Sequence, residues 1–268
     1  MRYSALSLLG NAFSKNKNWK PAWRNPDPKP HYDVIIIGGG GHGLATAYYL
    51  SKVFGVRNVA VLEKGYLGSG NVGRNTTIIR SNYLLQGNNP FYEFSMKLWE
   101  GLEQDFNFNA MVSQRGVINL FHSDAQRDAY TRRGNAMRLH GVDADLLGRD
   151  QLREKLPFLD YENARFPIMG GLMQKRGGTV RHDAVAWGFA RGADQNGVDI
   201  IQNCEVTAID RDGDQVTGVQ TTHGAIKCNK IGMAVAGNSS HVARMVDMRL
   251  PIESHALQRS EEHTTELQ

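Results

Sequence analysis

The chain has 268 residues, of which 41% are hydrophobic and 22% charged, a composition that indicates a globular protein and excludes a wholly disordered one. The net charge of +4 is spread without a long block of like charges, so nucleic-acid binding is not predicted. The two cysteines, Cys204 and Cys228, fit no metal or redox motif, which favours a reducing compartment.

The N-terminal region shows no targeting signal. No apolar run approaches the roughly 18 residues of a membrane helix, and residues 1–30 lack the apolar core of a signal peptide. We therefore expect a cytoplasmic protein without membrane contact. Residues 1–31, rich in Lys, Trp, Asn and Pro, form an N-terminal arm that either wraps on a partner or on the protein body, or is a loose tail.

The first predicted elements form one βαβ unit. Residues 32–38 are a continuous apolar run of the kind found in strands that are buried on both faces of a parallel sheet. A helix over 41–53 and a second buried strand over 58–62 follow. The crossover between two such parallel strands is expected to be right-handed.

The middle of the chain reads as a second domain inserted into the first. Residues 65–82 are expected to be a loop over the end of the sheet. The pattern then predicts helices over 91–106, 124–139 and 149–156, with a strand over 116–121. A helix over 182–197 and a strand over 198–206 follow. A meander of short strands comes next (207–210, 216–222, 225–228), and then one more buried strand over 231–236.

A glycine-rich segment closes the first strand and opens the first helix. Gly38, Gly40 and Gly43 satisfy the pattern G-x-G-x-x-G. In this pattern the first glycine permits a tight turn, the second lets the backbone approach a pyrophosphate, and the third lets helix and strand pack closely. The helix N-terminus then offers unpaired N–H groups and a partial positive charge to the phosphates.

Glu63 ends the second strand, 20 residues after Gly43. A carboxylate there can accept hydrogen bonds from both hydroxyls of an adenosine ribose, and it would repel the 2′-phosphate of NADP. The motif therefore predicts a bound ADP moiety. The alternative is a mere tight turn with a surface charge.

Spacing alone does not say whether the ADP belongs to NAD or FAD. The loop over 70–80 offers the small polar groups of Asn71, Thr76 and Thr77, and the cations Arg74 and Arg80. These groups would suit phosphate or ring edges, whereas a nicotinamide domain usually moves on to its next βα unit here. A solvated loop is the other interpretation.

Five segments together resemble the beta subunits of heterotetrameric sarcosine oxidases, within the D-amino-acid-oxidase-like flavoprotein superfamily. The resemblance covers nearly all of residues 1–258. The segments are DVIIIGGGGHGLATAYYL (33–50), NVAVLEKG (58–65), RNTTIIRSNY (74–83), SQRGVINL (113–120) and GVDIIQNCEV (197–206).

The resemblance implies oxidation of the C–N bond of sarcosine at a non-covalent FAD. Electrons would pass to a covalently held FMN and then to oxygen, giving glycine, hydrogen peroxide and a one-carbon unit caught by tetrahydrofolate. Alpha, gamma and delta subunits are the implied partners, with NAD on the alpha subunit. Within this comparison, FAD contacts fall on Gly41, His42, Glu63, Asn71, Thr76, Ile78 and Val206.

The covalent FMN falls on His182, where the neighbouring Asp183 could hold the imidazole in place. The other histidines have no metal-ligand spacing, so no metal is predicted. Arg80 is a candidate for the substrate carboxylate, with a flavin-phosphate or structural ion-pair role as alternatives. The catalytic residues are not identified in this stretch.

The implied architecture is α/β, with a Rossmann-like FAD-binding domain interleaved with an α+β substrate domain that has an antiparallel sheet. The FAD-binding parts are 32–83 and 181–258, and the substrate domain is 84–180. The family continues past residue 258, whereas residues 259–268 do not match it. We therefore expect a truncated gene with a non-native tail, and a chain that is inactive alone.

Two other functions stay open. One is a single-subunit FAD-dependent oxidase or dehydrogenase that acts on glycine, dimethylglycine or another secondary amine. The other is a nucleotide-binding assembly subunit, or a fragment unable to fold, without enzymatic activity.

Overall fold

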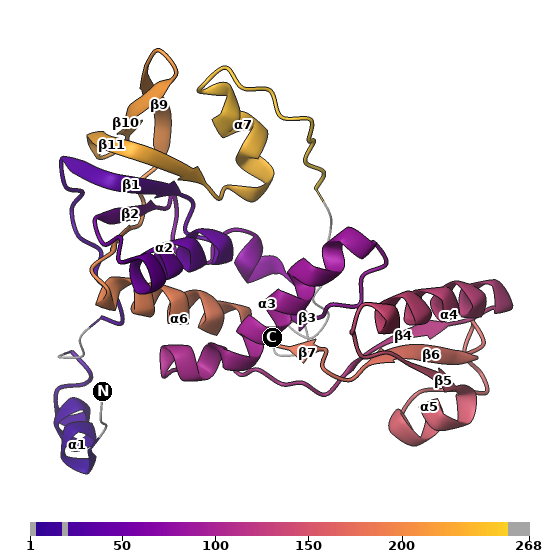
Figure 1. The fold of residues 1–268 in the computed structure, drawn as a ribbon. Helices are drawn as coiled ribbons and strands as arrows, with labels where there is room; N and C mark the ends of the chain where they lie inside the picture. The colour runs from indigo at the N-terminus through magenta and orange to yellow at the C-terminus, as the bar shows by residue number, and fades with distance from the viewer. Residues whose placement is uncertain (1–3, 18–20, 257–268) are drawn as a thin grey trace. The chain divides into compact units, whose positions relative to one another are not determined.

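The computed structural model describes residues 4–17 and 21–256 (Figure 1). The chain divides into two compact units, residues 1–72 with 189–268 (unit 1) and residues 73–188 (unit 2). The junctions predicted from sequence were 83/84 and 180/181, whereas the compact units change at 72/73 and 188/189. The domain roles stay predictions, and the expected non-native tail lies outside the described residues.

Unit 1 is built on a mixed sheet in the order β8-β2-β1-β11-β10-β9. β1 pairs in parallel with β2 and β11, and β2 pairs in parallel with β8, whereas β10 is antiparallel to both of its neighbours. The apolar runs of β1 and β2 suit central parallel strands, which are covered on both faces. The strands are β1 (His31–Ile37), β2 (Val59–Leu62), β8 (Asp199–Ile201), β9 (Val206–Asp212), β10 (Gln215–Thr221) and β11 (Gly224–Met233).

Helices cover both faces of this sheet. α2 (Gly41–Phe54) follows β1, α6 (His182–Gln195) precedes β8, and α7 (Ser239–Arg244) follows the short 3-10 helix η3 (Ala236–Asn238). The Tyr48 ring of α2 packs edge-on against Phe189 of α6, with centroids 5.6 Å apart. Ile35 and Ile37 share a different core with Val242 of α7. Figure 1 shows α2 and α7 on opposite sides of the sheet.

The strands near the end of unit 1 differ from the prediction. Residues 225–228 and 231–236 were expected to be two strands, but β11 is a single strand over Gly224–Met233. Its first half pairs antiparallel with β10, while residues from Lys227 to Met233 pair in parallel with β1. Strand β11 thus joins the β10–β11 hairpin to the parallel part of the sheet. The polar residues between the two predicted strands do not interrupt its pairing.

The strand expected over 198–206 was also wrong. It divides into β8 and the start of β9, because Asn203 adopts a left-handed conformation with φ of 56°. At this break the Cys204 N–H donates to the backbone oxygen of Glu63 at 2.9 Å. The turn therefore lies against the end of β2.

Unit 2 contains an antiparallel sheet in the order β4-β6-β5 and a two-stranded sheet, β3-β7. The fold class predicted from sequence is confirmed, including this antiparallel sheet. The short 3-10 helix η1 (Asn71–Arg74) spans the junction of the two units. The elements that follow it in unit 2 are β3 (Ile78–Ile79), η2 (Gln86–Asn88), α3 (Asn89–Phe106), β4 (Val117–Phe121), α4 (Asp124–Leu139), β5 (Asp145–Gly148), α5 (Arg149–Lys155), β6 (Gly170–Gln174) and β7 (Gly178–Thr179).

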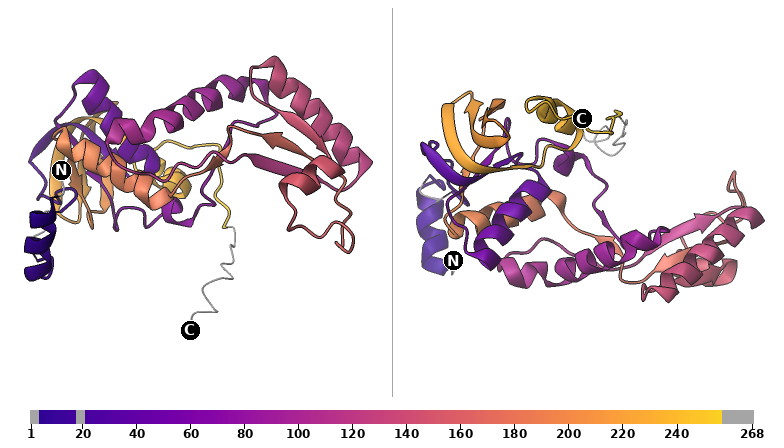
Figure 2. Two further views of the ribbon diagram at one scale, coloured as in Figure 1. Left: turned by 90° about the horizontal axis from the view of Figure 1, so that it is seen from below. Right: turned by 45° about the horizontal axis from the view of Figure 1, so that its top comes forward.

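Two cores hold the larger sheet of unit 2. Met173 of β6 packs with Leu152 of α5, and the adjacent Leu172 packs with Met137 of α4. Because successive side chains of a strand point to opposite faces, α4 and α5 cover the two sides of the sheet, as both ribbon figures show (Figure 1, Figure 2). Strands β5 and β6 were not predicted from sequence.

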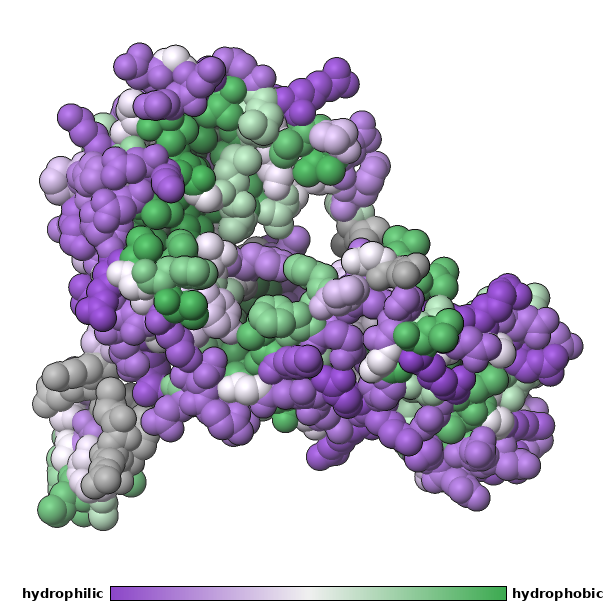
Figure 3. Space-filling view, in the orientation of Figure 1, coloured by the Kyte–Doolittle hydropathy of each residue, from purple (hydrophilic) through white to green (hydrophobic). Residues whose placement is uncertain are grey.

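The N-terminal arm contains a helix, α1 (Ala5–Phe13), that was not predicted and has no buried residue. Its hydrophobic side chains are visible on the surface in Figure 3, and those of Leu6 and Phe13 are more than 80% exposed, at 82% and 83%. Farther along, Lys29 pairs with the buried carboxylate of Asp199 at 2.7 Å. The part of the arm from Arg24 to Lys29 therefore contacts the body of unit 1, which is one of the three interpretations given for the arm.

Within the described ranges, no helix has the length and apolar character needed to cross a membrane.

Candidate functional site

The glycine fingerprint forms a tight turn between β1 and α2. Gly38 has φ of 108°, and a Cβ built on it would lie 2.4 Å from the backbone oxygen of Ala234. A Cβ on Gly43 would lie 1.9 Å from the backbone oxygen of Gly38. Both positions therefore require glycine for reasons of conformation and space. This is the close helix–strand packing expected of the motif.

The N-terminus of α2 is left available for an anion. Gly40 is the N-cap and provides no side-chain hydrogen bond, and the first turn contains no acidic residue. Gly41 and the exposed His42 begin the helix. The nearest atom to a Cβ on Gly40 or Gly41 would be Cγ2 of Val72, at 3.7 and 3.5 Å. Because helix N-termini attract negative charge, this end of α2 is suited to a phosphate.

Glu63 is fixed against the turn at the end of β2. Its Oε2 accepts a hydrogen bond from the Gly39 N–H at 2.7 Å, and its Oε1 accepts one from the Gly65 N–H at 2.9 Å. An ionised carboxylate has about four lone-pair sites, so both oxygens keep capacity for ligand hydroxyls. The structure thus brings the predicted acidic residue to the fingerprint and fixes its orientation.

Asn71 and Val206 also belong to unit 1. Asn71 is exposed and precedes Val72, whose side chain faces the start of α2. Val206 begins β9, two residues after Cys204, which bonds to the backbone of Glu63. The sequence-predicted residues of unit 1 therefore lie on the fingerprint turn, at Glu63, or on segments that run next to these.

Sequence reasoning missed the segment that follows β11. The Ala234 N–H donates to the Ile37 backbone oxygen at 2.9 Å, and Ala234 and Val235 are the residues nearest to Gly38. Ala234 and Val235 therefore form a wall of the turn. The sequence did contain a signal for this segment. A buried strand was predicted over 231–236, and the carboxyl ends of parallel strands lie at the same edge of a sheet, so the residues at its end could have been expected beside the fingerprint.

Thr76, Ile78 and His182 belong to unit 2. Ile78 pairs with Thr179 across β3 and β7, and the Val180 N–H donates to the Thr77 backbone oxygen at 3.0 Å. The loop that contains Thr76 and Ile78 therefore runs beside the segment that leads into His182.

His182 is the first residue of α6 and is half-buried. Its Nδ1 is buried and has no hydrogen-bond partner among the described residues. The expectation that Asp183 orients this imidazole was wrong. The Asp183 carboxylate instead accepts bonds from Arg181 at 2.7 and 2.9 Å and from the Ala184 N–H at 2.8 Å. Partial burial opposes ionisation, but these donors outweigh it and keep the pKa of Asp183 below its ordinary value.

Arg80 lies in unit 2, half-buried, next to Asn82 and Tyr83. Its Nη1 donates to Oδ1 of Asn82 at 2.7 Å, and its guanidinium lies 4.7 Å from the centroid of the Tyr83 ring. Within the part of the chain that the structure describes, Arg80 forms no ion pair. Its charge is therefore available for an anionic ligand. Arg74 is exposed in η1.

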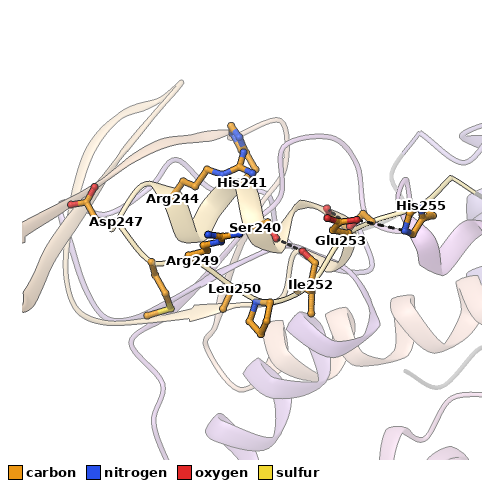
Figure 4. Close-up of a pocket in the computed structure, with 13 residues that line it drawn as sticks. Ser240, His241, Arg244, Asp247, Arg249, Leu250, Ile252, Glu253 and His255 are labelled. Carbon is orange, nitrogen blue, oxygen red and sulfur yellow. Dashed lines mark hydrogen bonds and ion pairs between the residues drawn. The ribbon is translucent and has the colours of Figure 1, made fainter.

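A separate cavity of about 1410 Å³ lies in unit 1 between α7 and residues 248–255 (Figure 4). The side chains of Arg244, Arg249 and His255 line it, together with Gly237. Two of its lining residues are joined by a hydrogen bond, from the Ser240 hydroxyl to the Ile252 backbone oxygen at 3.0 Å. None of the sequence-predicted site residues lines this cavity, so it is distinct from the fingerprint turn.

Among residues 4–17 and 21–256, no group of three or more His, Cys, Asp or Glu side chains is arranged to hold a metal ion.

Comparison with known families decides between the two dinucleotides, NAD and FAD, that the spacing left open. Residues 33–264 match the model of the family DAO, described as FAD dependent oxidoreductase. The chain belongs to the FAD-dependent oxidoreductase family. The family match therefore favours FAD over NAD as the dinucleotide of this FAD-dependent oxidoreductase. That the fingerprint and Glu63 hold it stays a prediction.

Two relatives show which kind of FAD-dependent oxidoreductase the chain resembles. This FAD-dependent oxidoreductase is 78% identical over 258 residues to sarcosine oxidase subunit beta of Rhizobium meliloti (strain 1021), covering 96% of the chain and 62% of the relative. The corresponding subunit of Arthrobacter sp is 52% identical over 237 residues, with coverage of 88% and 58%. The chain therefore spans about three fifths of the length of these relatives. The resemblance predicted from the five sequence segments is confirmed.

Solved structures show the same fold. L-Proline dehydrogenase from P. horikoshii superposes with a TM-score of 0.77 at 23% identity, covering 84% of this chain and 58% of that one. Glycine oxidase from Bacillus cereus ATCC 14579 has a TM-score of 0.68 at 25% identity, with coverage of 80% and 57%.

Proposed function

We propose that this chain is part of a sarcosine oxidase beta subunit that oxidises the C–N bond of sarcosine at a non-covalent FAD. The observation that carries the FAD site is Glu63, which is fixed by two backbone N–H groups beside the open N-terminus of α2. The identity of 78% to the Rhizobium meliloti subunit supports the substrate.

In this proposal, the two ends of the adenosine diphosphate are held by different groups. Glu63 accepts hydrogen bonds from the ribose hydroxyls, and the first turn of α2 faces the pyrophosphate. A negative charge at Glu63 excludes a 2′-phosphate. The FAD-binding set is Gly38, Gly40, Gly41, His42, Gly43, Glu63, Asn71, Thr76, Ile78 and Val206.

His182 is proposed as the point of covalent FMN attachment. The unpartnered, buried Nδ1 fits this role, because neither Asp183 nor another described side chain restrains the ring by a hydrogen bond. The bound flavins would supply hydride acceptance and electron transfer to oxygen, with glycine, hydrogen peroxide and methylene-tetrahydrofolate as the products. The protein supplies orientation and a dry electrostatic pocket.

Arg80 is proposed to bind the substrate carboxylate. It forms no ion pair within the described residues, which argues against the structural role considered above. Within the described part of the chain, Arg80 forms one side-chain hydrogen bond, from Nη1 to Asn82, so most of its five N–H donors stay available. A guanidinium matches a carboxylate in geometry as well as charge.

The proposed partners are the alpha, gamma and delta subunits, with NAD on the alpha subunit, in the cytoplasm. The term "subunit beta" in the names of the relatives supports a multi-subunit enzyme. As a second candidate, a single-subunit amine oxidase or dehydrogenase is supported by the glycine oxidase fold and by 26% identity to rat mitochondrial dimethylglycine dehydrogenase.

The test uses the full-length protein that contains this chain, expressed with the proposed partners. We expect Glu63→Gln to weaken FAD binding about tenfold, because a hydrogen bond to a charged group contributes about 1.5–3 kcal/mol. Asp212→Asn, at an exposed hairpin carboxylate, is the control. His182→Ala should abolish flavin fluorescence that persists after acid precipitation. Persistent fluorescence in that variant contradicts the attachment site, and absence of any acid-stable flavin in the unaltered protein favours the second candidate.

A further inference from the structure

Asn82 joins three elements of unit 2 in a fully buried position, with 0% exposure. Its Oδ1 accepts the hydrogen bond from Arg80 Nη1, and its Nδ2 donates to Oδ1 of Asn119, on β4, at 2.8 Å. Both ends of its amide are therefore occupied. The amide orientation is fixed, and so is the direction from which it holds Arg80.

Arg133 holds Asn82 from another side. This arginine lies on α4, 51 residues farther along the chain, and its Nη2 donates to the backbone oxygen of Asn82. The same Nη2 is 3.5 Å from Oδ1 of Asn82. The Arg133 guanidinium thus restrains Asn82, and Asn82 in turn restrains the Arg80 guanidinium.

Two tyrosine rings, Tyr83 and Tyr92, also help to hold the Arg80 guanidinium in place. The Tyr83 ring lies 4.7 Å from the guanidinium and stacks on Tyr92 of α3, with centroids 3.8 Å apart and an interplanar angle of 20°. Cation–π attraction favours this position of Arg80. The guanidinium is therefore held from one side by Asn82 and from another by a supported aromatic face.

The cluster has two positive charges, and no carboxylate of the described residues lies within ion-pair distance of either guanidinium. Burial lowers the pKa of Arg133, and the charge of Arg80 lowers it further. The Nε of Arg133 is also buried without a hydrogen-bond partner. Two like charges in a partly buried place repel each other, so an anion bound at Arg80 would relieve this repulsion.

We propose that Arg133 is a positioning residue for the substrate carboxylate: it acts through Asn82 to fix Arg80, and its charge adds to the attraction for the anion. This inference rests on the proposed function of Arg80. Arg133 need not touch the substrate, because its effect passes through the buried amide and through the electrostatic field.

The test compares the holoenzyme with Arg80→Gln, Arg133→Gln and the double variant. We expect Arg133→Gln to raise KM for the amino-acid substrate about tenfold while kcat at saturation stays within about twofold, because mainly ground-state binding is lost. The inhibition constant for acetate should rise by a similar factor, and that for neutral acetamide should not change. Arg133→Lys should restore part of the affinity, since it keeps the charge. Arg132→Gln, at the exposed neighbouring position, is the control.

The double variant separates positioning from simple structural support. We expect Arg133→Gln to raise the KM of Arg80→Gln by a smaller factor than it raises the KM of the unaltered enzyme, because the part of its effect that passes through Asn82 requires Arg80, whereas fully independent effects would add. An unchanged KM and acetate constant in Arg133→Gln, with a raised KM in Arg80→Gln, overturns the inference alone. Unchanged values in Arg80→Gln overturn its proposed function instead. If Arg133→Gln does not fold, Arg133→Lys decides: a KM raised several-fold at unchanged kcat supports the inference, and an unchanged KM overturns it.

Discussion

At the scale of single residues, two glycines of one motif have different physical reasons to be glycine. A Cβ on Gly43 would collide with the Gly38 backbone oxygen at 1.9 Å, whereas a Cβ on Gly40 would make an ordinary contact with Val72 at 3.7 Å. The first glycine therefore serves the packing of helix on strand. The second leaves space at the N-terminus of α2.

This difference predicts different outcomes for two alanine substitutions. Gly43→Ala should destabilise the protein by about 1–3 kcal/mol, the usual cost of overpacking. Gly40→Ala should lower the urea midpoint less than Gly43→Ala does, since alanine at the N-cap has only a modest cost. It should weaken FAD binding at least tenfold, because the methyl group occupies the space of the pyrophosphate. Circular dichroism and FAD titration measure the two effects. Normal FAD affinity in Gly40→Ala would place the dinucleotide elsewhere.

Residue-scale prediction succeeded where the determining contacts are local. The fingerprint and Glu63 could be found from sequence because their spacing follows from a strand, a turn and a helix. The role given to Asp183 was wrong, because two neighbours compete for its carboxylate and the bidentate guanidinium of Arg181 prevails. The contact of Arg133 with Asn82 depends on tertiary packing, and no local pattern indicates it.

At the scale of elements, α3 is attached to the end of β6 by charge. Arg176 donates to Glu93 at 2.7 Å and to Glu100 at 2.9 Å, two acidic residues on α3. The hydrogen bond from Arg176 lowers the pKa of Glu100 below its ordinary value of 4.5. The carboxyl thus binds its proton less tightly in the folded state. The interaction stabilises the fold above that pH and is lost as the pH falls through the lower, folded-state pKa.

Glu100→Gln should therefore lower the urea midpoint at pH 7, and the difference from the unaltered chain should be smaller at a pH well below 4.5. Urea unfolding followed by circular dichroism at both pH values is the measurement. Glu154→Gln, on the exposed side of α5, should show no such difference at either pH. A deficit of Glu100→Gln that is equal at both pH values would contradict the charge-based attachment.

Elements were predictable where capping and periodicity agree. The helix expected over 124–139 is observed with these bounds, because Ser123 caps it by accepting the Gln126 N–H. Strand β6 was missed because it includes Gly170 and Gly171, which have no side chain to give a strand pattern. A Cβ on Gly170 would lie 2.4 Å from the Phe121 ring, so these glycines serve pairing with a distant strand.

At the scale of the whole molecule, unit 2 is continuous in sequence and has its own cores. Residues 73–188 contain the complete β4-β6-β5 sheet with α4 and α5 on its faces. Unit 1 is assembled from two distant segments. That one domain interrupts another was expected from the returning strand pattern, but the junctions depend on tertiary contacts and could not be placed from sequence.

We predict that residues 73–188 fold when expressed alone, because a compact unit with its own hydrophobic core is able to do so. The expected result is a single cooperative urea transition by circular dichroism. A shorter chain, residues 73–168, lacks the central strand β6 and should show no such transition. A gradual, non-cooperative loss of signal from residues 73–188 would mean that the unit requires the rest of the chain.

The interleaving of the units also sets an order of events on the ribosome. β1 and β2 emerge early, but β8 and β11, which flank them in the sheet, are synthesised after all of unit 2. Both edges of the nascent β1–β2 pair therefore stay unpaired until the residues that follow unit 2 have been synthesised. Asp199, the anchor of the arm, and Ala234, which meets Gly38, arrive in this late stretch. The sheet edge at the fingerprint turn is thus completed only after unit 2 has been synthesised.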